Sequence, residues 1–595
     1  MSSRAERSAV EGTRAGRNCP APQHLPAGDP CTLLRFARIV KIALVTLLSL
    51  LVPHAYAREN NQKHLDAVKQ FADRVLEVGR DTYGPKHTPL FADGVNVDTL
   101  EPVVWRFEGN EWIISNFANQ QHLMRVLVGL SELTEEPKYQ QAAEDATRHM
   151  FEHHQDSSGL LYWGGHRFID LKTNTYASGF DSISHELKST HPYYELMWEV
   201  NPSGTERLLK AVWNAHVLDW SRLDMNRHGK WGLSMGRLWD NSFADPEPFF
   251  VGSGLTFINC GSDLILAAVS LHEHSNDEQA LTWAKRLAHQ YVKARHPQTQ
   301  LGVYQYSQAE QKKTPTPADD ADTSSGFGDR AKRQLGPEFG EVALEGNVLT
   351  PQRAFEIYGN VAVMQLTIAE RLGGRGDKLL KWTVDGLVAY ARYGHDAETN
   401  TLRPLLADGT DLSGHVLPRD GYFGKKGTKL EVREPPFQGV LTVSYARAYR
   451  LTGDERLRDM LRHLLIGHDV GDIGASAEST HDLKLETDVS DPEVLLALIE
   501  LHRREDKPEQ LELANRIADN IFKHRFHNGF FLPSRDHVNA NFDALEPLAL
   551  LTLEAHRRED VEAIAPYVGG GGYIHGAYDG HGRTYDRRVI WNQTR

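Results

Sequence analysis

The chain has 595 residues, of which 40% are hydrophobic and 9% aromatic, and this composition excludes a disordered protein. Its formal net charge of −14 argues against nucleic acid as a partner. A protein this acidic can bind a polyanion only if its positive charge is concentrated locally, in a cleft.

The first 57 residues are predicted to be a leader that contains a signal peptide. Three basic residues precede a short apolar run, and a small-x-small cleavage signal follows it: Arg35, Arg38 and Lys41, then Ile42 to Val52, then Ala55-Tyr56-Ala57. The run is too short for a comfortable transmembrane helix. We therefore expect a periplasmic or secreted protein with no stable membrane insertion after the signal is removed.

Loss of the leader changes both charge and cysteine content. The leader carries seven Lys/Arg and three Asp/Glu, so its removal takes the net charge from −14 to −18. Cys19 and Cys31 leave with it, and the mature chain keeps only Cys260, which excludes an internal disulfide. Cys260 lies in an apolar stretch and is interpreted as a core residue, not a nucleophile.

Helical periodicity dominates the remaining sequence, and it occurs in pairs separated by short polar turns. The predicted pairs are 118–133 with 138–154, 445–451 with 456–465, 491–504 with 511–526, and three further pairs within 189–220, 261–295 and 358–394. Two more helices, 64–83 and 544–556, have no neighbour in sequence and are expected to form a seventh pair.

Repeated helix pairs build either an open solenoid or a closed toroid. The long, irregular, aromatic-rich connections favour the toroid, because loops on one rim then build a central cleft. The sequence thus predicts an all-α protein in which residues 58–595 form a single catalytic (α/α) barrel of seven hairpins.

One segment, at about 307–347, interrupts the helical pattern and is predicted to be a mobile insertion. Its first half is a solvated polar run. Its second half, GFGDRAKRQLGPEFG, is glycine-punctuated and basic, which suits a loop over an anion-binding cleft as well as a surface insertion without function.

The sequence has 29 histidines, and two of them, together with one glutamate and one arginine, lie in local sequences that suggest a functional site. His166 follows two aromatics and two glycines in YWGGHRF, Glu186 lies in ISHELKSTHPYY, and Arg227-His228 lies in DMNRHGKWG. Two imidazoles and a carboxylate are a donor set for a first-row transition metal. If these side chains converge, an arginine lies beside the metal, where it would meet an anionic substrate such as an acidic sugar.

Other catalytic motifs are absent or incomplete. His185-Glu186 does not begin a zinc-protease HExxH motif, because Ser189 stands where the second histidine belongs and His191 is two residues late. There is no GxSxG elbow and no dinucleotide-binding glycine motif in a strand-to-helix context. Paired acids for glycoside hydrolysis remain open, with Asp240, Asp245 and Glu247 as the best candidates.

The sequence resembles polysaccharide lyase family 2, the manganese-assisted pectate lyases, on His166, Glu186 and Arg227-His228 within a set of helix pairs. The resemblance implies an (α/α)7 barrel. It also implies a metal held by His166, Glu186 and His228, with Arg227 as the Brønsted base. The expected reaction is β-elimination on polygalacturonate or its oligomers, in which the base removes the C5 proton.

The chemistry of the implied ligands favours Mn²⁺, or Co²⁺ or Ni²⁺, over Ca²⁺, which prefers an all-oxygen shell. A neutral guanidine is rare, so Lys230 and His228 are kept as alternative bases, although His228 is not available for this role if it is a ligand. Substrate-binding residues are expected among the nearby aromatics and cations: Tyr162, Trp163, Arg167, Lys230, Trp231, Arg237 and Arg330.

Two alternatives from other classes stay open. The first is an (α/α)-barrel glycoside hydrolase that acts on uronic or unsaturated oligosaccharides and needs no dication. The second is a non-catalytic helical-repeat protein that binds glycans or proteins and tolerates replacement of Arg227.

Overall fold

Helix pairs make up most of the computed structural model, which describes residues 62–107, 109–178, 184–309, 330–335, 337–419, 422–571 and 590–595. The predicted leader, 1–57, lies outside these residues. All six pairs predicted from adjacent segments are present: α2 (Gln121–Thr134) with α3 (Pro137–His153), α4 (Tyr194–Val200) with α5 (Pro202–His216), α6 (Ile258–Ser275) with α7 (Glu278–Lys293), α10 (Ala362–Leu372) with α11 (Asp377–Tyr393), α12 (Gly439–Thr452) with α13 (Glu455–Gly467), and α14 (Pro492–Glu505) with α15 (Pro508–Arg525).

A two-residue turn joins the helices in four of these pairs. The first turn residue has a left-handed backbone, with φ between 52° and 70°, and it ends the preceding helix: Glu135, Asn276, Gly453 and Asp506. The second is extended, and the next helix begins directly after it, in two cases with proline at its first position. The turns are therefore short because each residue either stops one helix or starts the next.

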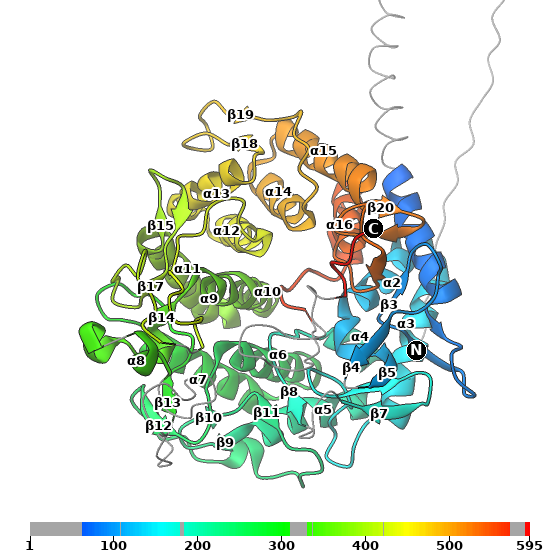
Figure 1. The fold of residues 1–595 in the computed structure, drawn as a ribbon, viewed down its shortest axis with the longest axis horizontal. Helices are drawn as coiled ribbons and strands as arrows, with labels where there is room; N and C mark the ends of the chain where they lie inside the picture. Colours follow the sequence, from blue (N-terminus) through cyan, green and yellow to red (C-terminus); the bar gives the residue numbers. More distant parts are fainter. Residues whose placement is uncertain are drawn as a thin grey trace, which may run out of the picture. The chain divides into compact units, whose positions relative to one another are not determined.

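One helix of each pair lies in an inner ring (Figure 1). Each inner helix contacts the next one around the ring, in the order α4, α6, α10, α12, α14, α16 (Glu546–Arg557) and α2. The Tyr193 N–H, at the start of α4, donates to the Gln121 side chain of α2 at 2.8 Å, which completes the circle. The ring confirms the predicted (α/α) barrel.

The seventh pair consists of α16 and the first described helix, 62–78. This first helix lies on the outer side, between α15 and α3. His64 bonds Asp519 of α15 at 2.8 Å, and Lys138 and Tyr139 of α3 bond Asp73 at 2.7 and 3.0 Å. The predicted helix 64–83 therefore exists, but it ends before Gly79.

The two ends of the described chain meet where the ring closes. Strand β22 (Asn539–Asn541) pairs antiparallel with β3 (Gly94–Asn96). The Asp543 carboxylate accepts the His122 N–H of α2 at 2.7 Å, a bond between residues 421 apart. Segments from opposite ends of the sequence are thus joined by backbone and side-chain bonds.

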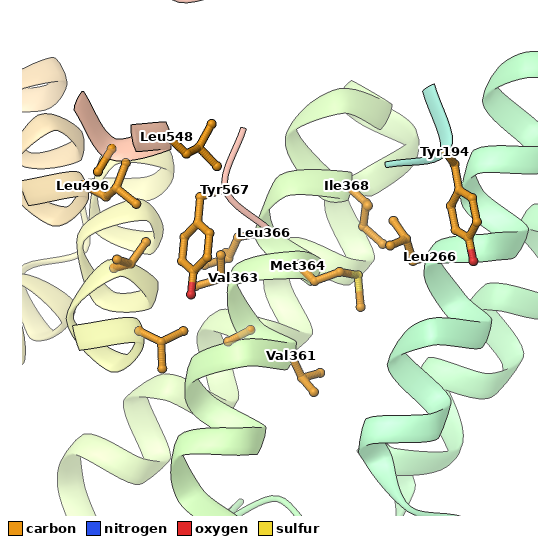
Figure 2. Packing of buried hydrophobic residues seen from close by; sticks show 14 of the residues in the cluster. Tyr194, Leu266, Val361, Val363, Met364, Leu366, Ile368, Leu496, Leu548 and Tyr567 are labelled. Atoms are coloured by element: carbon orange, nitrogen blue, oxygen red, sulfur yellow. The ribbon is translucent and has the colours of Figure 1, made fainter. Parts of the chain in front are cut away.

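Buried apolar faces of the inner helices form the main core. Figure 2 shows side chains of α6, α10, α14 and α16 in this core, with Tyr567 from the segment after α16 beside α10. The Tyr567 hydroxyl donates to Glu493 of α14 at 2.6 Å, and the Arg447 guanidinium of α12 donates to the Tyr567 carbonyl at 2.8 Å. This segment therefore ties two inner helices, α12 and α14, together inside the ring.

Short strands decorate the connections between helices. The two-stranded pairs are β1 (Arg80–Asp81) with β2 (Thr88–Phe91), β8 (His185–Glu186) with β11 (His228–Gly229), β9 (Val217–Asp219) with β10 (Asp224–Met225), β12 (Phe250–Gly252) with β13 (Ser307–Ala309), β14 (Val348–Leu349) with β17 (Leu405–Leu406), β15 (His395–Asp396) with β16 (Thr401–Leu402), β18 (Gly471–Asp472) with β19 (Asp482–Leu483), and β20 (Phe526–His527) with β21 (Phe530–Phe531). A four-stranded sheet contains β4 (Val104–Phe107), β5 (Asn110–Ser115), β6 (Phe168–Asp170) and β7 (Thr175–Ala177).

The predicted insertion at about 307–347 lies partly outside the described residues, since 310–329 are not among them. Its described second half contains α8 (Arg330–Leu335). Ala331 and Leu335 of α8 pack with Leu406, Leu412 and Leu417 in a small apolar cluster. The short helices α9 (Pro351–Ala354) and the π-helical turn η5 (Phe355–Val361) follow and lead into α10.

Residues 63–595 form one compact unit. Among the helices that the structure describes, none combines the length and the apolar character needed to cross a membrane.

Candidate metal and active site

Glu186 and His228 face each other because β8 and β11 pair in antiparallel register. The Leu187 N–H also donates to the Arg227 carbonyl at 3.0 Å. His228 Nε2 lies 3.4 Å from Glu186 Oε1, and the Glu186 side chain is fully buried. Two short strands therefore bring together residues that are far apart in the sequence.

His166 reaches the same point from the loop before β6. Its Nε2 lies 3.2 Å from Glu186 Oε2 and 3.1 Å from His228 Nε2. Asn116 fixes this loop, because its side chain both accepts the Gly164 N–H at 3.1 Å and donates to the Gly164 carbonyl at 2.8 Å. Gly164 itself has φ of +100°, a conformation that favours glycine.

These three residues fit a transition metal. One ligand atom from each of His166, Glu186 and His228 lies within 4.8 Å of the other two, and no other group of three potential ligands in the described part of the chain does so. Ligand atoms about 2.1 Å from one ion lie about 3.0 to 3.5 Å from each other, as the contact distances here do. Burial lowers the pKa of His166 to about 4, so its imidazole is neutral and able to ligate at neutral pH.

Arg227 lies beside this donor set. Its Nε is 3.3 Å from Glu186 Oε1, and the guanidinium lies 5.9 Å from the Phe257 ring. Lys188 adds a second positive charge that acts on His166. The sequence prediction omitted Lys188, which follows β8 two residues after Glu186.

Three of the predicted substrate-binding residues, two aromatic and one cationic, lie together in a cluster. The Tyr162 and Trp231 rings lie 4.7 Å apart, and the Arg167 guanidinium lies 4.6 Å from the Tyr162 ring. Tyr176 of β7, which the sequence prediction missed, lies 4.1 Å from Tyr162 and is 39% exposed. The Trp231 ring of this cluster lies 5.3 Å from that of His185, the residue before Glu186.

The structure corrects the prediction for Trp163. Its side chain is buried against Phe117, with ring centroids 5.9 Å apart, and the indole N–H donates to His185 Nε2 at 2.9 Å. Trp163 therefore belongs to the core and offers no face to a sugar.

The remaining predicted residues are less closely placed. Lys230 is exposed, two residues beyond His228. Arg237 is also exposed, and its guanidinium donates to the Asp240 carbonyl at 2.8 Å. Arg330 begins α8, but its side chain lies outside the part of the structure that is described.

His185 and His191 do not join the candidate ligands. Neighbouring residues of a strand point to opposite faces, so His185 turns away from Glu186 and bonds His216 Nε2 at 2.8 Å. Burial lowers the pKa of His185 well below its ordinary value and that of His216 to about 4. His191 bonds the Ser262 hydroxyl at 3.1 Å, which agrees with the rejection of a zinc-protease motif.

The candidate hydrolase acids do not converge on the site. Asp240 and Glu247 are exposed, and Asp245 bonds Lys293 of α7 at 2.7 Å. Cys260 is fully buried, and burial raises the pKa of its thiol, which confirms its interpretation as a core residue.

Fold and site together define a helical barrel with a candidate transition-metal centre. Residues 88–577 match the family described as periplasmic pectate lyase. The chain is also 37% identical over 552 residues to the pectate disaccharide-lyase of Dickeya dadantii (strain 3937), covering 89% of this chain and 96% of that protein. The chain therefore belongs to the periplasmic pectate lyase family.

The comparison with solved structures also finds proteins that are similar to this chain at low sequence identity. A cellobiose 2-epimerase from Spirochaeta thermophila DSM 6192 is 13% identical, with a TM-score of 0.37 over 78% of this chain and 98% of that one. An α-1,6-mannanase from Salegentibacter sp. HEL1_6 is 11% identical, with a TM-score of 0.36 over 83% and 99%.

Family membership confirms that the protein is a polysaccharide lyase, and it confirms the predicted periplasmic location. Both alternatives from the sequence, the glycoside hydrolase and the non-catalytic binding protein, are thereby set aside.

Proposed function

We propose that the protein is a metal-assisted pectate lyase that cleaves polygalacturonate or oligogalacturonates by β-elimination, for pectin degradation. The observation that carries the proposal is the convergence of His166, Glu186 and His228 with Arg227 against the same carboxylate. The name of the Dickeya relative supports the substrate class.

His166, Glu186 and His228 would hold the metal through two neutral imidazoles and one carboxylate. Nitrogen ligands favour Mn²⁺, with Co²⁺ or Ni²⁺ as substitutes, over Ca²⁺. When bound, such an ion supplies positive charge to the uronate carboxylate and so stabilises the negative charge that develops as C5 loses its proton.

Arg227 is the proposed base. It takes the C5 proton, the C5–H electron pair becomes the C4=C5 double bond, and the glycosidic oxygen leaves C4 with its bonding pair and then takes a proton from solvent. A dication bound by His166, Glu186 and His228 would offset the Glu186 carboxylate beside Arg227 and so lower the cost of a neutral guanidine. Lys230 is exposed and lies farther along the chain, so it is the weaker candidate for this role.

Substrate contacts are proposed for Tyr162, Arg167 and Trp231, together with Tyr176 and Lys188. Arg167 and Lys188 supply the local positive charge that an acidic protein needs to bind a polyuronate. The aromatic rings supply apolar faces on which sugar rings stack.

The test is ultraviolet absorbance of the unsaturated uronate product during incubation with polygalacturonate. Absorbance should increase with time, the increase should stop when the metal is chelated, and it should resume on addition of Mn²⁺. Reducing ends that accumulate without this absorbance would refute β-elimination, and activity that survives exhaustive chelation would refute the metal.

Replacing Arg227 with lysine tests its role as the proton acceptor separately from the effect of its positive charge. Arg227→Lys keeps a cation beside Glu186 but changes the position and basicity of the proton acceptor. We expect kcat to fall by about 10² to 10⁴, while Mn²⁺ affinity stays close to that of the unaltered protein. Arg106→Lys, at an arginine of β4 whose side chain is 69% exposed and has no assigned role in the site, is the control, and an Arg227→Lys enzyme of normal kcat would exclude Arg227 as the base.

A further inference from the structure

A chain of hydrogen bonds runs beneath the candidate ligands. The Trp163 indole N–H donates to His185 Nε2 at 2.9 Å. His185 Nδ1 lies 2.8 Å from His216 Nε2, and His216 Nδ1 lies 2.7 Å from the Asn226 carbonyl oxygen. Both imidazoles are fully buried, with exposed fractions of 0%.

The two ends of this hydrogen-bond chain, the Trp163 indole and the Asn226 carbonyl, determine the tautomer of both imidazole rings. An indole N–H can only donate and a carbonyl oxygen can only accept. His185 must therefore accept at Nε2 and donate from Nδ1, and His216 must do the same. A second proton on either ring would face another N–H group, so the chain is complete only when both imidazoles are neutral Nδ1–H tautomers.

Each member of the chain is close in sequence to a residue of the site. Trp163 lies in the loop that carries His166, His185 immediately precedes Glu186, and Asn226 immediately precedes Arg227-His228. The chain thus joins the three segments that supply ligands.

Packing reinforces these bonds at β11. A Cβ added to Gly229 would lie 2.5 Å from His216 Nε2, so the His216 ring packs directly against the backbone that follows His228. The His185 ring packs edge-on against Trp231, with centroids 5.3 Å apart and an interplanar angle of 81°. The spacing of loop 163–166, β8 and β11 therefore depends on the two imidazoles.

We propose that His185 and His216 are positioning residues for the metal centre. They hold the segments that carry His166, Glu186 and His228 at the separation that a single ion requires. This role rests on the metal function proposed above. Neither histidine touches the substrate or the ion, and each acts through the backbone next to it.

If the two histidines had only a structural role, replacing them would lower the stability of the protein without changing the metal affinity of the protein that remains folded. The two roles are separated by measuring Mn²⁺ affinity of the folded protein, by electron paramagnetic resonance of free Mn²⁺, alongside thermal unfolding of the metal-free form.

The decisive variants are His216→Phe and His216→Gln. Phenylalanine fills the ring volume but breaks both bonds of His216, whereas glutamine offers an oxygen to His185 Nδ1–H. We expect His216→Phe to weaken Mn²⁺ binding by about tenfold or more, the range typical of groups that orient metal ligands. His216→Gln should recover part of that loss, and it keeps the test valid if the phenylalanine variant does not fold.

His556→Phe is the matched control. His556 Nε2 bonds His502 Nδ1 at 2.9 Å, so this variant also removes a histidine pair, but between α14 and α16. We expect it to lower the unfolding temperature and leave Mn²⁺ affinity unchanged.

The outcomes are distinguishable. An unaltered protein that binds no Mn²⁺ would overturn the metal function, and the positioning role with it. An unaltered protein that binds Mn²⁺, with equal affinity in folded His216→Phe, would overturn the positioning role alone.

Discussion

Gly164 shows how a single residue controls the distance between two ligand segments. It has φ of +100°, and a Cβ at this position would lie 3.1 Å from the Glu186 carbonyl oxygen. A side chain here would force the loop that carries His166 and β8 apart by a few tenths of an ångström, in addition to the strain of the positive φ.

Gly164→Ala is therefore expected to weaken Mn²⁺ binding and lyase activity as well as stability. The positive φ alone costs about 1 to 2 kcal/mol, and the clash pushes the His166 loop away from Glu186. Mn²⁺ titration and thermal unfolding of the same sample measure the two effects.

Gly109→Ala is the control for backbone strain. Gly109 has φ of +82°, but a Cβ there meets no atom within 4 Å. It should lose stability alone, and equal losses of Mn²⁺ affinity in both variants would contradict the role assigned to Gly164.

Individual residues of the site differ in how well the sequence predicts them. The residue types at His166, Glu186 and Arg227-His228 suffice to indicate a metal site, and their convergence depends on the β8–β11 register. A Trp in a helical barrel is more often a core residue than a sugar platform, and the contacts that decide between the two for Trp163, with Phe117 and with His185 22 residues away, are tertiary. Tyr176 was missed because it reaches the cluster only through strand pairing in the four-stranded sheet.

At the scale of elements, helix starts are set by specific side chains. The Asp491 carboxylate accepts the Glu493 N–H at 2.8 Å and the Val494 N–H at 3.3 Å at the N-terminus of α14. It satisfies donors that have no partner within the helix.

Asp491→Ala should lower the free energy of unfolding by about 1 kcal/mol, as loss of such a cap typically does. Denaturant unfolding measures the change. Lys507→Ala is the comparison, because Lys507 occupies the same position before α15 and its side chain makes no capping bond. Equal destabilisation by the two changes would argue against the cap.

Elements with strong local signals were the ones that the sequence predicted. Apolar spacing, a polar turn and a proline at the helix start, as in Asp506-Lys507-Pro508, are all local, and the predicted pairs formed accordingly. Most of the strands have only two or three residues, which is too short for an alternating apolar pattern to identify them, and some, such as β8 with β11 and β3 with β22, pair with segments distant in sequence. The short β8 and β11, which position the site, are among them.

At the scale of the whole molecule, buried ion pairs link neighbouring inner helices. Glu500 of α14 accepts from Arg447 Nε of α12 at 2.6 Å and also from Arg450. Burial alone would raise the pKa of Glu500, but the two guanidinium groups outweigh it and hold the pKa at about 2.

Glu500→Gln should therefore destabilise the protein by about 3 to 5 kcal/mol, because it leaves the buried Arg447 guanidinium without a carboxylate, whereas Arg450 keeps Glu370. Since the folded pKa of Glu500 is lowered from 4.5 to about 2, the ion pairs stabilise the fold above pH 4.5 and lose this contribution as the pH falls toward 2. The variant should thus lose less stability than the unaltered protein across that interval, as measured by urea unfolding at several pH values.

Glu111→Gln serves as the exposed counterpart. The Arg106–Glu111 pair has side chains that are 69% and 52% exposed, and its loss should change stability by less than about 1 kcal/mol. A Glu500→Gln protein as stable as Glu111→Gln would mean that the buried pairs contribute nothing.

The meeting of β3 with β22 and of His122 with Asp543 has a consequence for biosynthesis. During translation the N-terminal helices emerge long before the residues that complete their pairing, and closing so large a loop is slow. The barrel therefore cannot close until Asp543 has left the ribosome. For a periplasmic protein, a barrel that stays open during synthesis is compatible with export of the polypeptide.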